Sequence, residues 1–108
     1  MGKPITQERM EEALDYLLET DVSCAAAKAD MEREEFKAEA IKDAIFLRSS
    51  GNVEERKALS KTHPEYAIAK NKHFDAIKTY ESIRNRRSTE EIVWETWRSI
   101  NSNSRQAK

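Results

Sequence analysis

The chain of 108 residues holds little glycine, proline, histidine or cysteine, with two residues of each of the first three and one cysteine. The shortage of glycine and proline disfavours a sheet, because the turns between strands rely on such residues. A single cysteine, Cys24, cannot form an internal disulfide and fits a reducing cytoplasm. Since Gly2 and Gly51 are the only glycines, a glycine-rich phosphate-binding loop is excluded.

The few residues suited to catalysis form no known pattern. His63 and His73 lie ten residues apart, and neither has a glutamate three residues before it, as di-metal helical bundles require. We interpret His63 as a helix cap or exposed residue and His73 as a half-buried helix residue. Cys24 lacks a histidine partner in the sequence and is interpreted as a packing residue. We therefore expect no catalytic residue, metal site or cofactor, and a protein that is not an enzyme.

Long apolar segments are also missing. No run approaches the roughly 20 apolar residues that span a bilayer. Met1-Gly2-Lys3-Pro4 leads directly into a helix start, without the apolar core of a secretory signal. We expect no membrane contact and a cytoplasmic location.

What the chain does contain favours helices. Charged residues make up 36% and hydrophobic residues 38%, a balance typical of solvated helices with a thin core. A chain of this length forms one domain at most. Because thin helical pairs often complete their cores by self-association, we expect a coiled-coil-like homo-oligomer, with a dimer as the first hypothesis.

Capping residues and breakers predict the helix boundaries. Thr6 caps a first helix that ends near Thr20, and Asp21 caps a second over residues 22–48. Gly51 is an expected terminator. Ser88 and Glu91 form a capping-box pattern, which either breaks the later helix or lies inside it. The remaining expected segments are helices over 53–61, 64–87 and 89–101, which gives a single helical domain at 5–101 and a disordered tail at 102–108.

Apolar spacing predicts which faces pack. In the second helix, one face is marked by alanines with Phe36 and Leu47, and Ile41 and Ile45 lie beside it. The segment 64–87 repeats apolar residues at spacings of three and four. The expected fold is all-α, a long antiparallel helical hairpin of 22–49 with 64–87 and short accessory helices. The predicted faces are Met10, Ala13, Leu14 and Leu17; Ala25, Ala29, Phe36, Ala40, Ala44 and Leu47; and Tyr66, Ala69, His73, Ala76, Ile77, Tyr80 and Ile83.

Charge is distributed unevenly along the chain. Residues 1–50 hold seven basic and twelve acidic side chains, and residues 84–108 hold six basic and three acidic ones. A row of arginines near the C-terminus could follow nucleic-acid phosphates. The preferred interpretation is that the row pairs with the acidic surface of residues 30–39. The candidate nucleic-acid-binding residues are Arg84, Arg86, Arg87, Arg98 and Arg105.

Trp94 and Trp97 are the strongest apolar candidates for a binding site. They are three residues apart, so a helix places both on one surface patch. Tryptophan dominates many protein interfaces, which makes the pair the predicted partner-binding site. Packing in the core or in a homo-oligomer, and stacking on nucleic-acid bases, are the other interpretations.

Several stretches resemble small helical proteins of tailed bacteriophages and prophages, which are often encoded near recombination and replication genes. The resemblance covers about residues 20–106 and carries no catalytic residue. It implies an all-helical fold and a non-enzymatic accessory protein that binds a phage or host DNA-metabolism protein in the bacterial cytoplasm. The alternative function is direct nucleic-acid binding. The stretches are Ser23–Arg33, Lys42–Leu47, Val53–Ala58 and Trp97–Asn101, followed by Arg105-Gln106.

Overall fold

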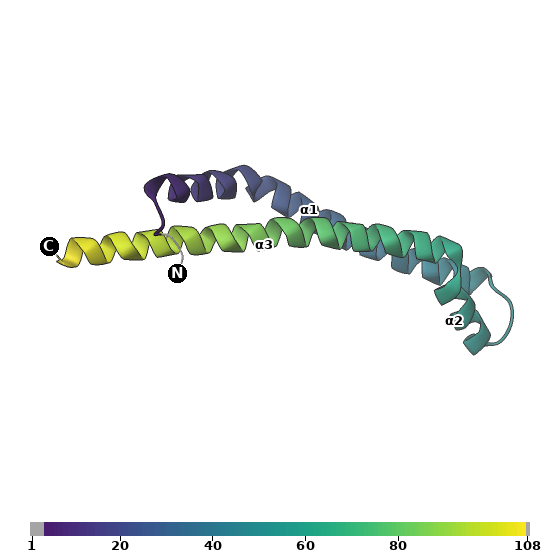
Figure 1. Cartoon of the computed structure of the whole chain (residues 1–108). Coiled ribbons are helices and arrows are strands. Elements are labelled where there is room, and N and C mark those ends of the chain that lie inside the picture. Colours follow the sequence, from purple (N-terminus) through teal and green to yellow (C-terminus); the bar gives the residue numbers. More distant parts are fainter. Residues whose placement is uncertain (1–3, 108) are drawn as a thin grey trace. The chain divides into compact units, whose positions relative to one another are not determined.

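The computed structural model describes the backbone of residues 4–107 and the side chains of residues 4–103. It contains three helices, α1 (Gln7–Arg48), α2 (Val53–Thr62) and α3 (Pro64–Ala107), shown in Figure 1. Residues 4–107 include no strand, and α1 and α3 form a long helical hairpin, which confirms the all-α prediction. Within that range no helix combines the length and the apolar character that crossing a membrane requires.

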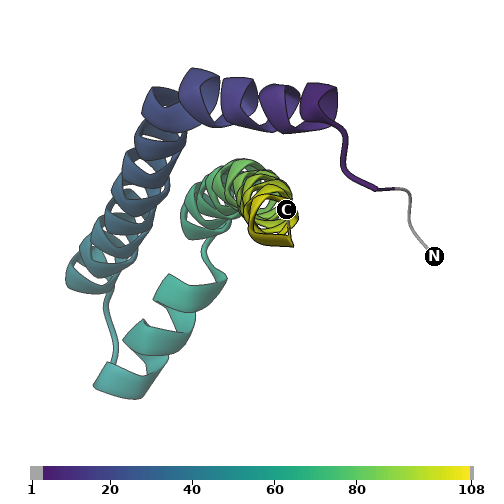
Figure 2. The same ribbon diagram turned by 90° about the vertical axis from the view of Figure 1, so that its left-hand side faces the viewer.

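The described residues group into two compact units. The first unit pairs the part of α1 up to Ala25 with the part of α3 from Glu81 onward. The second unit, Ala26–Tyr80, pairs the rest of α1 with the start of α3, and α2 lies at the turn between them (Figure 2). The single domain at residues 5–101 stays a prediction.

A heptad pattern explains why α1 and α3 pair. Both helices carry a row of residues at alternating spacings of three and four, and none of the residues in either row is exposed. Such a repeat keeps one stripe of each helix facing its partner, as in a coiled coil. The α1 row is Met10, Ala13, Leu17, Thr20, Cys24, Ala27, Met31, Glu34, Ala38, Ile41 and Ile45, and the α3 row is Tyr66, Ala69, His73, Ala76, Tyr80, Ile83, Arg87, Glu90, Trp94, Trp97 and Asn101.

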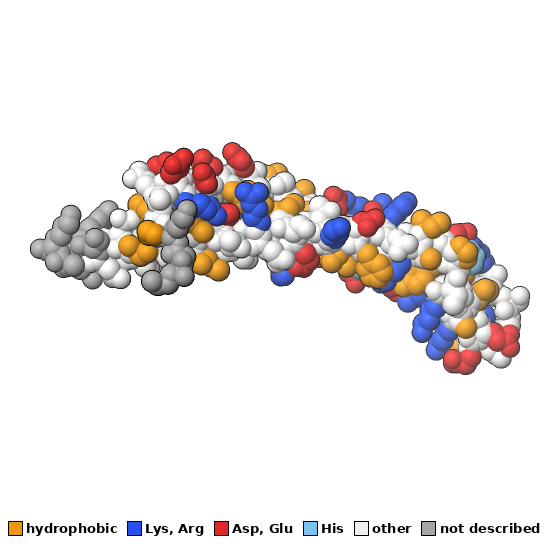
Figure 3. Space-filling view, viewed as in Figure 1, with side chains coloured by type: hydrophobic (Ala, Val, Ile, Leu, Met, Phe, Trp, Pro, Cys, Tyr) orange, Lys and Arg blue, Asp and Glu red, His pale blue; other side chains and the backbone are white. Residues whose placement is uncertain are grey.

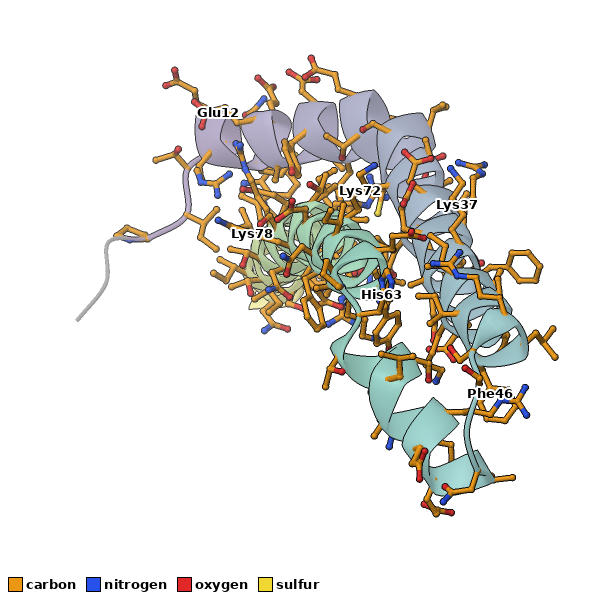
Figure 4. The ribbon with its side chains drawn as sticks, turned by 90° about the vertical axis from the view of Figure 1, so that its right-hand side faces the viewer. Glu12, Lys37, Phe46, His63, Lys72 and Lys78 are labelled. Carbon is orange, nitrogen blue, oxygen red and sulfur yellow. The ribbon has the colours of Figure 1, made fainter. Side chains whose placement is uncertain are left out.

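A capping side chain precedes each of the three helices, which confirms the caps predicted at Thr6 and His63. The Thr6 hydroxyl accepts a hydrogen bond from the Arg9 N–H at 3.0 Å, and the Asn52 side chain accepts one from the Glu55 N–H at 2.9 Å. His63 Nδ1 accepts the Glu65 N–H at 3.1 Å, so His63 caps α3 at the junction with α2 (Figure 4). Gly51 has a φ of 113°, a conformation that residues with a Cβ rarely adopt.

Two predicted helix ends, near Thr20 and at residue 101, differ from the structure, and at Ser88, where both a break and a continuous helix were expected alternatives, the helix is continuous. α1 passes through Asp21 without a break, because the neighbouring hydroxyls bond to helix carbonyls instead of capping: Thr20 donates to the Tyr16 oxygen at 2.6 Å. α3 likewise passes through Ser88, and the Thr89 hydroxyl donates to the Asn85 oxygen at 3.2 Å. With neither glycine nor proline at these places, the helix has no reason to stop. The helix also continues to Ala107, through most of the predicted tail; Lys108 lies outside the described residues.

The predicted packing face of α1 is also wrong in its second half. The residues assigned to it are exposed, including Phe36 at 76% and Leu47 at 75%. The buried residues are instead Ala27, Ala38 and Ile45, which belong to the heptad row. The sequence prediction followed the larger apolar side chains on one face. The hairpin packs through the opposite face, where the buried alanines Ala27 and Ala38 allow close approach.

His73 is the member of the α3 row that has a buried polar atom without a hydrogen bond. The residue is 7% exposed, and its Nδ1 is buried without a hydrogen-bond partner. A buried polar atom without a partner costs on the order of 1–3 kcal/mol. We expect His73→Leu to raise the free energy of unfolding by about 1 kcal/mol, measured by urea denaturation followed by circular dichroism. The half-buried His63 serves as a contrast, because His63→Leu removes a helix cap and is expected to destabilise the fold. A loss of stability in His73→Leu would show that the ring makes a favourable contact.

Candidate interaction surfaces

The first unit is held by a charge pair between distant parts of the chain. Arg9 donates two hydrogen bonds to the Glu90 carboxylate, at 2.6 and 2.9 Å. The side chain of Glu90 is only 6% exposed and that of Arg9 is 37% exposed. These hydrogen bonds lower the pKa of Glu90 against the effect of burial, and they raise the pKa of Arg9. The Glu90 carboxylate therefore stays ionised between α1 and α3 at neutral pH, which makes it unsuited to general acid–base catalysis.

Arg87, the centre of the predicted basic row, is used inside the same unit. Its Nη1 donates to the Leu17 carbonyl oxygen at 2.7 Å and to the Thr20 hydroxyl at 2.8 Å. Its Nη2 lies 3.4 Å from Asp21, and the side chain is 18% exposed. Arg87 thereby joins α1 to α3 and fixes their register. A guanidinium with this many internal acceptors has little capacity left for a phosphate.

The other described arginines of the row are more exposed, but each has an acidic or aromatic neighbour. Arg84 pairs with Glu81 at 2.6 Å and Arg98 with Glu95 at 2.5 Å, both on α3. The Arg86 guanidinium lies 4.0 Å from the centre of the Tyr16 ring and 3.8 Å from Glu90. The side chain of Arg105 lies outside the described residues.

The ion pairs found for the described arginines of the row are made within the first unit. Their partners are Glu81, Glu90, Asp21 and Glu95, and do not include the acidic residues 30–39 that were the alternative interpretation. The acidic side chains of the first part of α1 gather on one outer surface in Figure 3, and Glu12 among them projects away from α3 in Figure 4. The exposed members of this surface are Glu8, Glu11, Glu12, Asp15 and Glu19.

The structure places Trp94 and Trp97 together, as the spacing predicts. Their rings stack with centres 6.1 Å apart and planes 18° apart, and both side chains are half-buried. None of the hydrogen bonds found among the described residues involves either indole N–H. Each indole therefore combines a packed part with an open polar part, which is typical of interface residues.

The second unit has a hollow between α1 and α2, with a volume of about 400 Å³. Its lining combines the Phe46 ring, seen in Figure 4 at the end of α1, with Ser60, Asp43 and three lysines. Lys42, one of these, has a raised pKa because it bonds to Glu39, so it is held as a charged ammonium and is a poor nucleophile. Residues 4–103 hold no group of three His, Cys, Asp or Glu side chains placed to bind a metal.

Sequence reasoning missed Arg9, Tyr16 and Glu90 as members of the first unit. The signal for Glu90 was present, because the spacing of three and four that was recognised up to Ile83 continues through Arg87, Glu90 and Trp94. The charges at Arg87 and Glu90 hid the pattern. Arg9 had no comparable signal, since its partner lies 81 residues away.

Comparisons with models of protein families, with curated proteins and with solved structures find no match to this chain.

Proposed function

We propose that the chain is a non-enzymatic accessory protein that binds another protein through the surface at Trp94 and Trp97. The observation that carries the proposal is the stacked pair itself, half-buried and with both indole N–H groups unused by the hydrogen bonds of residues 4–103. Trp94 and Trp97 together present a flat apolar surface with polar N–H groups at its edges. Residues of this kind contribute most of the binding energy at many protein interfaces.

The nature of the partner is proposed from the resemblance alone. The stretches quoted above resemble small phage and prophage proteins, which are often encoded beside recombination and replication genes. We therefore propose a phage or host DNA-metabolism protein in the bacterial cytoplasm as the partner. We also propose that the chain acts as a homo-oligomer, since ten large hydrophobic side chains are exposed on its described part.

Tryptophan fluorescence tests this proposal directly, because Trp94 and Trp97 are the only tryptophans of the chain. On titration with purified DNA-metabolism proteins of the host, a partner that covers the pair should shift the emission to shorter wavelength and protect it from acrylamide quenching. Trp97→Ala should weaken binding by about tenfold or more, because a central tryptophan contributes upward of 2 kcal/mol.

Ile92→Ala is the matched control, because Ile92 is a 66% exposed apolar residue of the same helix. Its binding should stay within about twofold of the wild type. Loss of binding in Ile92→Ala and not in Trp97→Ala would overturn the assignment of the surface. Binding to oligonucleotides that weakens steeply as salt rises would favour direct nucleic-acid binding instead. The internal pairing of Arg87 argues against that outcome.

A further inference from the structure

The outer face of α1 in the second unit carries a second heptad row that nothing in residues 4–103 covers. It consists of Ala29, Arg33, Phe36, Ala40, Asp43 and Leu47, at alternating spacings of four and three, and all six residues are exposed. Phe36 and Leu47 are among the most exposed large hydrophobic side chains of the chain, at 76% and 75%. The row lies opposite Ala38, which is fully buried against the hairpin.

We propose that this face pairs with the same face of a second copy of the chain, antiparallel, about a two-fold axis at the level of residue 38. The assignment rests on the self-association included in the proposed function, but it does not depend on the tryptophan surface or on a foreign partner.

The order of residues in the row is what favours a second copy over a different protein. Positions 29 and 47, 33 and 43, and 36 and 40 lie at equal distances on either side of position 38. Two identical antiparallel helices centred there bring the members of each pair together, and the symmetry makes each pairing occur twice. The facing pairs are Ala29 with the partner's Leu47, Phe36 with the partner's Ala40, and Arg33 with the partner's Asp43.

These pairings are complementary in size and in charge. A small residue faces a large one at two levels, which lets helices approach closely, and opposite charges face at the third. Asp43, which lines the edge of the hollow beside Lys42, is in none of the ion pairs of residues 4–103. Arg33 pairs only with the exposed Asp30 on its own helix. A parallel arrangement would instead set Arg33 against its own copy, with like charges in contact.

The residues beside the row are already neutralised within one chain. Lys37, which projects from α1 in Figure 4, pairs with Glu34 at 3.5 Å, and Glu39 pairs with Lys42 at 2.9 Å. If Lys37 or Glu39 meets its own copy across the two-fold axis, its charge is therefore already balanced by a partner within the same chain. From Ala29 to Leu47 the face extends over roughly 28 Å of helix, at 1.5 Å per residue.

Sedimentation equilibrium of the purified chain, from about 1 µM to about 1 mM, tests the pairing. We expect a reversible monomer–dimer equilibrium. Phe36→Asp should weaken it by at least roughly a hundredfold, because the substitution places a carboxylate in two symmetry-related contacts. Phe74→Asp is the matched control. Phe74 is a 53% exposed phenylalanine on α3 of the same unit, and its replacement should leave the dimer constant within about twofold.

A charge exchange tests the antiparallel register. Arg33→Asp and Asp43→Arg alone should each weaken the dimer by about fivefold to tenfold, because each sets like charges opposite one another twice. The double variant Arg33→Asp/Asp43→Arg should recover a dimer constant within about twofold of the wild type. Circular dichroism confirms that each variant remains helical.

A chain that stays monomeric over the whole range overturns both the pairing and the proposed oligomer. A dimer that Phe36→Asp leaves intact, or that the charge exchange fails to restore, overturns the assigned face or register. The oligomer part of the proposed function survives that result. The protein-binding part is read separately from tryptophan fluorescence.

Discussion

Replacing Arg9 with alanine is expected to lower the free energy of unfolding by about 3 kcal/mol, because it leaves the Glu90 carboxylate buried without its main partner. Glu90 is 6% exposed and receives two hydrogen bonds from Arg9. Arg86, at 3.8 Å, is too distant and too exposed to replace them. Denaturation with urea, followed by far-ultraviolet circular dichroism, measures the change.

The matched control for this substitution is Arg98→Ala. Arg98 also pairs with a glutamate in the first unit, but both partners are exposed and lie three residues apart on α3. Its loss should cost about 0.3 kcal/mol. An Arg9→Ala variant as stable as Arg98→Ala would mean that Glu90 finds water or another cation when Arg9 is gone.

The same pair makes stability depend on pH. Hydrogen bonds from Arg9 hold the pKa of Glu90 in the folded chain below its usual range. The folded state therefore binds fewer protons than the unfolded state in the acid range, and stability rises with pH there. The contribution is present in full above the unfolded pKa of about 4.3 and is lost as the pH falls through the folded pKa of Glu90. This acid-induced loss should be smaller in Arg9→Ala, because the carboxyl then titrates closer to its unfolded value.

The sequence allowed the fold class to be predicted because helix formers and caps act locally. Thr6, Asn52 and His63 cap helices through bonds to residues two or three positions away, so a short stretch of sequence contains the whole interaction. The helix end near Thr20 and the cap at Asp21 were mispredicted for the same reason, and Ser88 could not be decided between a break and a continuous helix. Their residue types suit caps, but without glycine or proline beside them the helix continues.

The candidate site was less predictable, because it depends on partners far apart in the sequence. Trp94 and Trp97 could be paired from their spacing alone. The role of Arg87 could not be predicted. Its acceptors, the Leu17 carbonyl and the Thr20 hydroxyl, are about seventy residues away, and they can be identified only once the register of the hairpin is known. Polar residues inside a heptad row specify register, and they also break the apolar pattern from which the row would be recognised.

Ala38→Glu is the sharpest test of which face of α1 packs in the second unit. Ala38 is fully buried in the heptad row, whereas Ala44, on the face that the larger apolar residues suggested, is exposed. A glutamate at position 38 would have to bury its carboxylate, because Ala38 has no exposed surface in the hairpin. We expect a loss of about 3–5 kcal/mol in the free energy of unfolding, since an unpaired buried charge costs several kcal/mol.

Ala44→Glu should change the free energy of unfolding by less than about 0.5 kcal/mol, because the added side chain points into solvent and glutamate is a good helix former. Both variants add the same group to the same helix, so helix propensity and net charge cancel in the comparison. Chemical denaturation at low protein concentration keeps self-association out of the measurement. The reverse order of effects would show that α1 packs through the face of Phe36 and Leu47, and that the heptad row of Ala27, Ala38 and Ile45 is exposed.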